Sequence, residues 1–337
     1  MVKMKKVTVN DLAKISGYSQ PTVSRALNDS NLISVEVKQK IQELAKKMNY
    51  RPNIAARSLA GKKTGIIGFY IFQMEHAMHP TLSQVLQGAT RVAAEEGYNL
   101  LLVLTDEDTN KGEVAARNYL DGILIPTQET TEEEIKFLES QNIPFVLLNR
   151  EPDEKRYVVN IDYEKVAMDI TEHLSQAGHR RIAYLSGPED FWINRALLKG
   201  YRKASEQFLG GLQCIRFGDW SEEEGYKLAS ELLELPNHPT AFFGEDFLIA
   251  GALRAIKERG FSVPKDIALV GINDVPLISS LDPPISSMRL PMDKLGEEAA
   301  GLLIKLLSGK KAKKQVLLPG ELIIRESSKQ EFQEEVS

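Results

Sequence analysis

Residues 17–28, near the start of the chain, carry side chains that could hydrogen-bond to another molecule. The segment reads GYSQPTVSRALN, and helical spacing leaves its polar side chains mostly on the outside: Gln20, Thr22, Ser24, Arg25 and Asn28. An arginine guanidinium pairs well with the edge of guanine, while hydroxyl and amide groups commonly contact phosphate. These residue types at this spacing are suited to contacts with DNA.

Two short helices must position these side chains. Thr8 can cap the first helix, with Asp11 at the capping-box position three residues later, and Gly17 can end it. Ser19 can cap the second helix, and Pro21 falls in its first turn, where the missing N–H costs nothing. Two short helices joined by a glycine-containing turn form a helix-turn-helix, which places its second helix in the DNA major groove.

A third helix is predicted next, with Ser34 as its cap. Apolar residues at helical spacing would join the three helices in one core: Leu12 and Ile15, then Val23, Ala26 and Leu27, then Val37, Ile41, Leu44, Ala45 and Met48. On this pattern alone, a plain three-helix bundle without a DNA partner is the alternative.

The charge distribution favours a polyanionic partner for this part of the chain. Residues 1–63 carry 13 Lys and Arg against 4 Asp and Glu, which is +9 in a 337-residue chain of net charge −5. The remainder therefore carries −14. A basic module on an acidic body suits nucleic acid, although a solvated lysine-rich head would have the same composition.

Composition also bears on the compartment. No segment reaches the roughly 18 consecutive apolar residues of a membrane span, and residues 1–14 lack the apolar core of a signal peptide. Cys214 is the only cysteine, so neither an intrachain disulfide nor a CxxC metal site can form. We expect a cytoplasmic protein with no membrane partner.

A short basic segment follows the three helices. The Arg51-Pro52 step ends the preceding structure, and Asn53 can cap a run over residues 54–60. One or two turns do not hold as a helix alone, so we expect this run to fold on a partner. Leu59 would be its exposed apolar residue, of the type used as a wedge in the minor groove. An ordinary interdomain linker is the alternative.

From residue 65 onward, buried-strand patterns alternate with helical ones, which predicts doubly wound parallel sheets. About ten strands indicate two sheets, with ligands at the carboxyl ends of the strands. The motifs GxGxxG, GxSxG and HExxH are absent, and GKKT at residues 61–64 lacks the leading glycine of a phosphate loop. Glu75, His76 and His79 form a weak metal pattern. We expect no enzyme activity, no cofactor and no metal.

The segments VTVNDLAKISGYSQPTVSRALN and NYRPNIAARSLAG resemble the DNA-binding head and hinge of the LacI/GalR family of bacterial transcription regulators. GHRRIAYLSGP, GDWSEEEGY, VPKDIALVGIND and GELIIRESS are similar to that family's effector-binding body, which resembles type I periplasmic sugar-binding proteins. The resemblance implies a head at residues 1–52, a hinge at 53–63 and a two-lobed α/β body at 64–337. Its N-lobe would be about 64–161 and 289–319, and its C-lobe about 162–288 and 320–330.

The resemblance also implies a homodimer on a pseudo-palindromic operator and names the residues of two sites. DNA contacts would be Thr8, Ser19, Gln20, Pro21, Thr22, Ser24, Arg25, Asn28, Ser34, Tyr50, Asn53, Ala56 and Leu59. Effector contacts would be Gln73, His79, Asn149, Trp192, Arg195, Trp220, Glu245, Asp246, Asn273 and Asp274. The C-terminal KQEFQEEVS has no leucine heptads, so no tetramer-forming bundle is expected.

Several positions differ from the family's pattern. Leu197 stands where an arginine is typical, Glu245-Asp246 replaces Asn-Asp, and Asn273 replaces the first aspartate of a pair. These changes alter charge at the expected cleft, so the common sugar effector cannot simply be carried over. A neutral or cationic small polar ligand would tolerate Glu245 better than an anionic one. A protein or phosphorylated coregulator, or a solute-binding transport role, are the alternatives.

Overall fold

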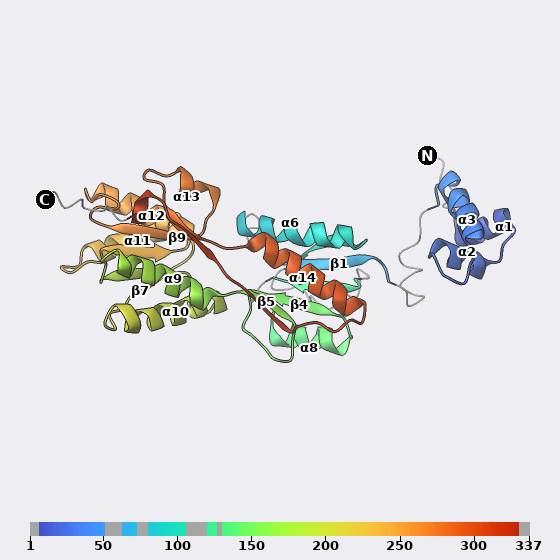
Figure 1. Ribbon diagram of the computed structural model, residues 1–337, viewed down its shortest axis with the longest axis horizontal. Coiled ribbons are helices and arrows are strands. Elements are labelled where there is room, and N and C mark those ends of the chain that lie inside the picture. Colours follow the sequence, from blue (N-terminus) through green and yellow to red (C-terminus); the bar gives the residue numbers. More distant parts are fainter. Residues whose placement is uncertain (1–6, 51–62, 73–79, 106–119, 127–129, 330–337) are drawn as a thin grey trace. The chain divides into compact units, whose positions relative to one another are not determined.

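The computed structural model describes residues 7–50, 63–72, 80–105, 120–126 and 130–329. The chain divides into two compact units, Met1–Thr64 and Gly65–Ser337, and each is described by itself (Figure 1). None of the helices within these described ranges combines the length and apolar character that a membrane crossing requires.

The first unit contains three helices: α1 (Val9–Ser16), α2 (Gln20–Leu27) and α3 (Val35–Lys47). The Thr8–Asp11 capping box is confirmed, since each side chain binds the other residue's backbone N–H. Gly17 ends α1 in the left-handed conformation at φ +74°, which glycine adopts without strain. Ser19 accepts a hydrogen bond from the Thr22 N–H, as predicted. Ser34 stands at the N-cap of α3 but makes no such bond, so its predicted capping bond is absent.

The predicted core of the three helices is largely confirmed. Leu12, Val23, Ala26 and Ile41 have no exposed surface, and other predicted positions pack around them. Ile15 is the exception, because 59% of its side chain is exposed in the last turn of α1. With only eight residues, α1 contributes Leu12 alone as a fully buried side chain.

Two six-stranded sheets form the second unit, and the predicted doubly wound architecture is confirmed. The first sheet has the order β11 (Gln315–Leu318), β5 (Val158–Ile161), β4 (Phe145–Leu148), β3 (Gly122–Ile125), β1 (Ile66–Phe72) and β2 (Asn99–Thr105), all parallel. The second has the order β12 (Glu321–Ile323), β10 (Ser286–Arg289), β9 (Ala268–Asn273), β8 (Ala241–Gly244), β6 (Ile182–Ser186) and β7 (Cys214–Phe217). In this sheet only β12 is antiparallel to its neighbour.

Helices connect the strands of both sheets (Figure 1). Those that accompany the first sheet are α6 (Pro80–Glu95), α8 (Glu132–Ser140) and α14 (Met292–Leu307). Those that accompany the second are α9 (Tyr163–Gln176), α10 (Trp192–Phe208), α11 (Glu222–Leu233), α12 (Asp246–Glu258), α13 (Pro276–Ser280) and the short 3₁₀ helix η1 (Glu326–Ser328). Within residues 130–329 the chain crosses between the sheets after β5, after β10 and between β11 and β12.

Glycines allow α6 and α14 to approach each other closely. A Cβ atom on Gly88 would lie 1.9 Å from the Asp293 carbonyl oxygen, and one on Gly296 would lie 2.0 Å from that of Val85. Any side chain at either position would push the helices apart. This close pair matters for function because the N-terminal turns of both helices border the cavity described below.

Candidate functional site

The outer side of α2 presents most of the polar residues predicted to contact DNA. Gln20, Pro21, Arg25 and Asn28 are exposed, while Val23 and Ala26 on the opposite side are buried. Ser19 and Thr22 are joined by a hydrogen bond of 2.8 Å between their hydroxyl oxygens at the start of the helix. The free N–H groups at a helix N-terminus favour phosphate nearby. The structure therefore groups guanidinium, amide and hydroxyl side chains on one accessible helix surface.

The other residues predicted to contact DNA lie around this surface or outside the described ranges. Thr8 is engaged in the α1 capping box, Ser34 is exposed at the start of α3, and Tyr50 is partly buried against the three-helix core. Asn53, Ala56 and Leu59 lie outside the described residues.

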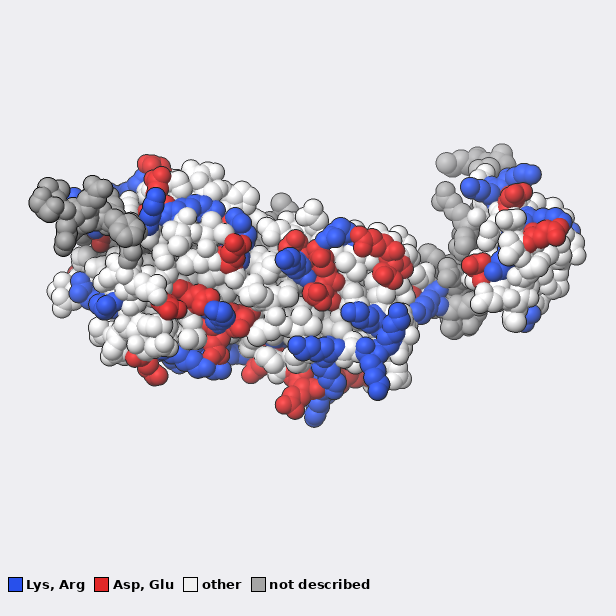
Figure 2. All heavy atoms as spheres, viewed as in Figure 1, with Lys and Arg blue, Asp and Glu red and all other residues white. Residues whose placement is uncertain are grey.

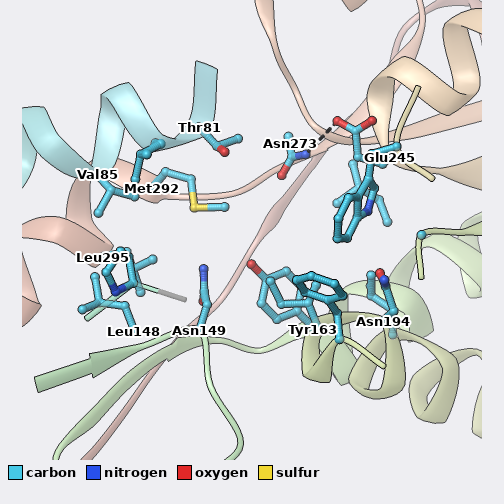
Figure 3. Close-up of a pocket in the computed structure, with 18 of the residues that line it drawn as sticks. Thr81, Val85, Leu148, Asn149, Tyr163, Asn194, Glu245, Asn273, Met292 and Leu295 are labelled. Carbon is cyan, nitrogen blue, oxygen red and sulfur yellow. Dashed lines mark hydrogen bonds between the residues drawn. The ribbon is translucent and has the colours of Figure 1, made fainter. Parts of the chain in front are cut away.

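A cavity of about 270 Å³ lies in the second unit, between its two sheets (Figure 3). Strand ends build much of it: Asn149 follows β4, Gly187 follows β6, Glu245 follows β8, and Asn273 ends β9. The carboxyl ends of parallel strands are the expected ligand-binding edge of such sheets. Of the predicted effector residues, Asn149, Trp220, Glu245 and Asn273 line the cavity.

The cavity has two unlike sides (Figure 3). On one side, α6, α14 and β4 supply Val85, Leu148, Met292 and Leu295, and on the other lie Tyr163, Asn194, Glu245 and Asn273. The first side is mostly apolar but also carries the Thr81 hydroxyl and the Asn149 amide, whereas the second has a carboxylate, amides and aromatic rings. This arrangement suits a ligand that has an apolar part and a polar part.

Glu245 is held in place at the polar side of the cavity. Its carboxylate accepts a hydrogen bond of 2.8 Å from the Phe247 N–H at the start of α12, and another of 3.2 Å from the Asn273 amide. Asn273 has φ +109° and Asn149 has φ +48°, values that asparagine adopts more readily than most residues. Asn149 also accepts a hydrogen bond from the Ile161 N–H at 3.3 Å. The polar groups are therefore fixed by the backbone before a ligand arrives.

Trp220 covers the end of β6. Its indole packs edge-to-face on Phe191, with ring centroids 4.8 Å apart, and a Cβ atom on Gly187 would lie 2.1 Å from its Nε1. Glycine at position 187 is therefore required for the indole to lie there. An indole offers a flat apolar surface and one N–H donor, which suits the face and edge of a polar ring.

Two predicted effector residues, Asp246 and Asp274, are not among the residues that line the cavity. Asp246 has no exposed surface, and its carboxylate accepts hydrogen bonds from the Val275 N–H at 2.7 Å and the Ser287 hydroxyl at 2.8 Å. Asp274 pairs with Arg289 and Arg325, each with a nitrogen 2.7 Å from a carboxylate oxygen. Their carboxylates join α12, β9 and β10 in this structure, and their predicted contact with the effector stays a prediction.

Asp246 makes stability depend on pH. Burial raises the pKa of its carboxyl well above the usual range, and the charges of Glu245 and Asp274 raise it further. The folded chain thus favours the protonated form, so stability falls as pH rises above the unfolded value of about 4. Asp246→Asn should lack this fall, and its stability relative to the unchanged protein should improve from acid to neutral pH. Urea denaturation of both proteins across this pH range measures the difference in their free energies of unfolding. A difference that does not change with pH would contradict the raised pKa of Asp246.

Trp192 and Arg195 also lie outside the cavity lining. Trp192 packs edge-to-face on Tyr163, with centroids 5.9 Å apart, and Arg195 pairs with Glu151 at 3.2 Å. The reason is the helical spacing of α10, which places Ile193, Asn194 and Leu197 on the side that faces the cavity and Trp192 and Arg195 on other sides. Gln73 and His79 lie outside the described residues.

Sequence reasoning missed several residues that line the cavity. They are Leu82, Val85, Pro126, Leu148, Tyr163, Tyr184, Leu185, Gly187, Phe191, Ile193, Asn194, Met292, Ile272 and Leu295. Asn194 could have been predicted, because it lies one helical turn before Leu197, the position at which the family typically has an arginine. Phe191 had no local signal, since its place depends on contact with Trp220, far away along the chain.

Both units of the chain are similar to known protein families. Residues 8–53 match the family described as bacterial regulatory proteins, lacI family, and residues 171–328 match a periplasmic binding protein-like domain. A probable HTH-type transcriptional repressor ExuR of Bacillus subtilis is 33% identical over 95% of this chain and 98% of its own. Catabolite control protein A of Priestia megaterium is 31% identical, and the match covers 96% of this chain and 99% of that protein.

A solved structure extends the similarity to the fold. The lac repressor dimer bound to operator and the anti-inducer ONPF is 26% identical, with a TM-score of 0.83 over 96% of this chain and 99% of that one. The chain therefore belongs to the LacI family of bacterial regulatory proteins.

Proposed function

We propose that this protein is a cytoplasmic transcriptional repressor that binds a pseudo-palindromic operator as a homodimer and responds to a small molecule in its cavity. Residues 1–52 would be the DNA-binding head, 53–63 the hinge and 64–337 the effector-binding and dimerisation body. The observation that carries the proposal is the polar outer surface of α2 within the region that matches the lacI family. Because that region matches regulators, a transport role is not favoured.

Some polar side chains of α2 would contact the edges of bases, and others would contact phosphates. Arg25 and Gln20 would contact base edges, where arginine favours guanine. Thr22, Ser24, Asn28 and Ser34 would contact phosphate and set the register on the duplex. Pro21, exposed in the first turn, offers no hydrogen-bond donor, so it can contribute only apolar contact such as that with a thymine methyl.

A dimer places two α2 helices in successive major grooves, which is why a pseudo-palindromic site is expected. The hinge residues Asn53, Ala56 and Leu59 would lie between them, with Leu59 as the minor-groove wedge. Selection of bound sequences from a random DNA library tests this. We expect two inverted half-sites with centres one helical turn, or a multiple of it, apart. Enrichment of one asymmetric half-site, or of no sequence, would contradict the dimer.

The cavity can control DNA binding only if its ligand prefers one arrangement of the two lobes. The lining comes from both sheets, so a ligand that contacts both sides would favour the arrangement in which they are close. The experiment is a screen of sugars, nucleosides, amino acids and amines by thermal shift, with release of selected operator DNA measured beside it. A ligand that binds without any effect on DNA binding would contradict control through this cavity.

Trp220 provides a direct signal for occupation of the cavity. The chain has two tryptophans, so Trp192→Phe leaves Trp220 as the single source of indole fluorescence. We expect the effector to shift or quench this emission, because it displaces water from the indole surface. The matched control is Trp220→Phe, in which Trp192 should respond weakly. An effector that releases operator DNA with no change in Trp220 emission would show that Trp220 is structural.

A further inference from the structure

Lys38 in α3 has different surroundings from the other lysines of the three-helix unit. Lysine, arginine and carboxylate side chains lie next to one another on the face of this unit that Figure 2 shows. The other lysines within residues 7–50 are exposed, whereas the Lys38 side chain is only 13% exposed. Its ammonium nitrogen lies 2.8 Å from a carboxylate oxygen of Asp29 and donates to the Asp29 carbonyl oxygen at 3.1 Å. The charge of Lys38 is therefore used within the protein, on a single residue.

Asp29 forms the C-terminal cap of α2. Its N–H donates to the Ala26 carbonyl oxygen at 3.2 Å, and the Ser30 N–H donates to that of Arg25 at 3.0 Å. Asp29 itself has φ +52°, in the left-handed region. These are the hydrogen bonds of a Schellman cap, whose left-handed residue is usually glycine. Because aspartate adopts this conformation at a greater cost in free energy than glycine, a contact that holds Asp29 there stabilises the end of α2.

Side chains proposed to contact DNA lie just before this cap. Arg25 is in the last turn of α2, and Asn28 is its C-cap residue. The Arg25 carbonyl oxygen is one of the two acceptors of the cap, so the conformation of Asp29 and the direction of the Arg25 backbone are linked. A contact with a base edge requires a side chain placed within about 0.5 Å, whereas attraction to phosphate extends over roughly 10 Å. A loose end of α2 therefore weakens operator binding more than binding to random DNA.

We propose that Lys38 is a positioning residue for base reading: it holds the end of α2 through Asp29, so that Arg25 keeps its direction, and it does not bind phosphate. This rests on the proposed function, since it concerns how the same helix reads the operator. The pair has a second effect, because the Asp29 carboxylate is 80% exposed directly after Asn28. Without the Lys38 charge beside it, this carboxylate would repel the phosphates that Asn28 contacts.

Lys38→Met tests the proposal, because it keeps an unbranched apolar side chain and removes the ammonium group. In the full chain, affinity for the selected operator should fall about tenfold, the effect of hydrogen bonds from one charged group, and affinity for a scrambled duplex less than about twofold. Lys38→Arg retains a cation and should recover most of the operator affinity. Titrations of both duplexes measure these changes.

The salt dependence of operator binding separates positioning from direct contact. A lysine that binds phosphate lowers the salt slope by about 1 when it is removed, so Lys38→Met should leave the slope nearly unchanged. Lys40→Met is the matched control, because it removes the same group two residues later in α3. Lys40 is exposed and pairs with Glu36 at 2.8 Å, within the same helix. This control should weaken binding to both duplexes slightly and to the same extent.

Asp29→Gly tests the link between Lys38 and α2. Glycine adopts φ +52° without strain and carries no carboxylate, so the cap should persist without help from Lys38. Lys38→Met should therefore lose most of its effect on operator affinity in the Asp29→Gly background, which a double-mutant cycle measures. Circular dichroism and binding to the scrambled duplex identify a variant whose three helices do not fold. If Lys38→Met alone does not fold, Asp29→Gly should restore folding and operator binding to the double variant.

The outcomes separate this proposal from the proposed function. Equal losses on both duplexes, a salt slope lowered by about 1, or an undiminished effect in the Asp29→Gly background would each overturn the positioning role of Lys38. A double variant that stays unfolded would do the same. In all these cases, operator binding by the unchanged protein would still support the repressor. If the unchanged protein bound no DNA sequence selectively, both proposals would be overturned.

Discussion

Arg25→Ala is expected to weaken binding to the operator by about 1–3 kcal/mol, or roughly 5- to 150-fold, while binding to random DNA changes far less. Arg25 is exposed in the last turn of α2, on the side opposite to the buried Val23 and Ala26. A guanidinium that donates two hydrogen bonds to one guanine loses both on truncation, and random DNA offers that guanine only by chance. Titrations with selected operator and scrambled duplexes measure the two affinities.

Lys47→Ala is the matched control for Arg25→Ala, because it removes one exposed positive charge from the last turn of α3. Lys47→Ala should lower the affinity for the operator and for the scrambled duplex slightly and to the same extent. The salt dependence of binding separates the roles further. Loss of a phosphate contact lowers the salt slope by about 1, whereas loss of a base contact leaves it nearly unchanged. Equal losses by Arg25→Ala on both duplexes would show that Arg25 does not discriminate between bases.

Gly296→Ala is expected to destabilise the body by about 2 kcal/mol or more and to weaken effector binding. The added Cβ would lie 2.0 Å from the Val85 carbonyl oxygen, so α6 and α14 must separate. Both helices contribute to the cavity lining, through Val85 and Leu295 among others, and their movement changes the apolar side. Urea denaturation and calorimetry with the identified ligand measure the two effects.

Gly301→Ala is the control for this change, five residues later in the same helix. There the nearest atom to an added Cβ would be Val92 Cγ1, at 4.0 Å, so no clash results. Because alanine is a better helix former than glycine, the free energy of unfolding of this variant should increase by up to about 1 kcal/mol. If both variants behaved alike, helix propensity rather than the close approach of α6 and α14 would govern position 296.

The first unit could be predicted nearly residue by residue because its signals are local. A cap such as Thr8 or Ser19 acts within three residues, and Gly17 ends α1 through its own backbone. The exceptions follow the same reasoning. Ile15 has the spacing of a core residue, but in so short a helix its burial depends on neighbours that the spacing does not specify. Ser34 has the position of a cap without its hydrogen bond.

The sequence by itself determined the family, the helix-turn-helix and the alternation of strands and helices that builds two sheets. The family resemblance also indicated Asn149, Glu245 and Asn273, which the structure has at or directly after the ends of β4, β8 and β9. Only the tertiary structure decided which polar side chains reach the cavity. Glu245 and Asp246 are adjacent, yet one lines the cavity and the other is fully buried, since successive side chains at the start of α12 point in different directions. The charge and shape that a ligand meets depend on these directions and on contacts such as Phe191 with Trp220, which join parts of the chain that no local pattern connects.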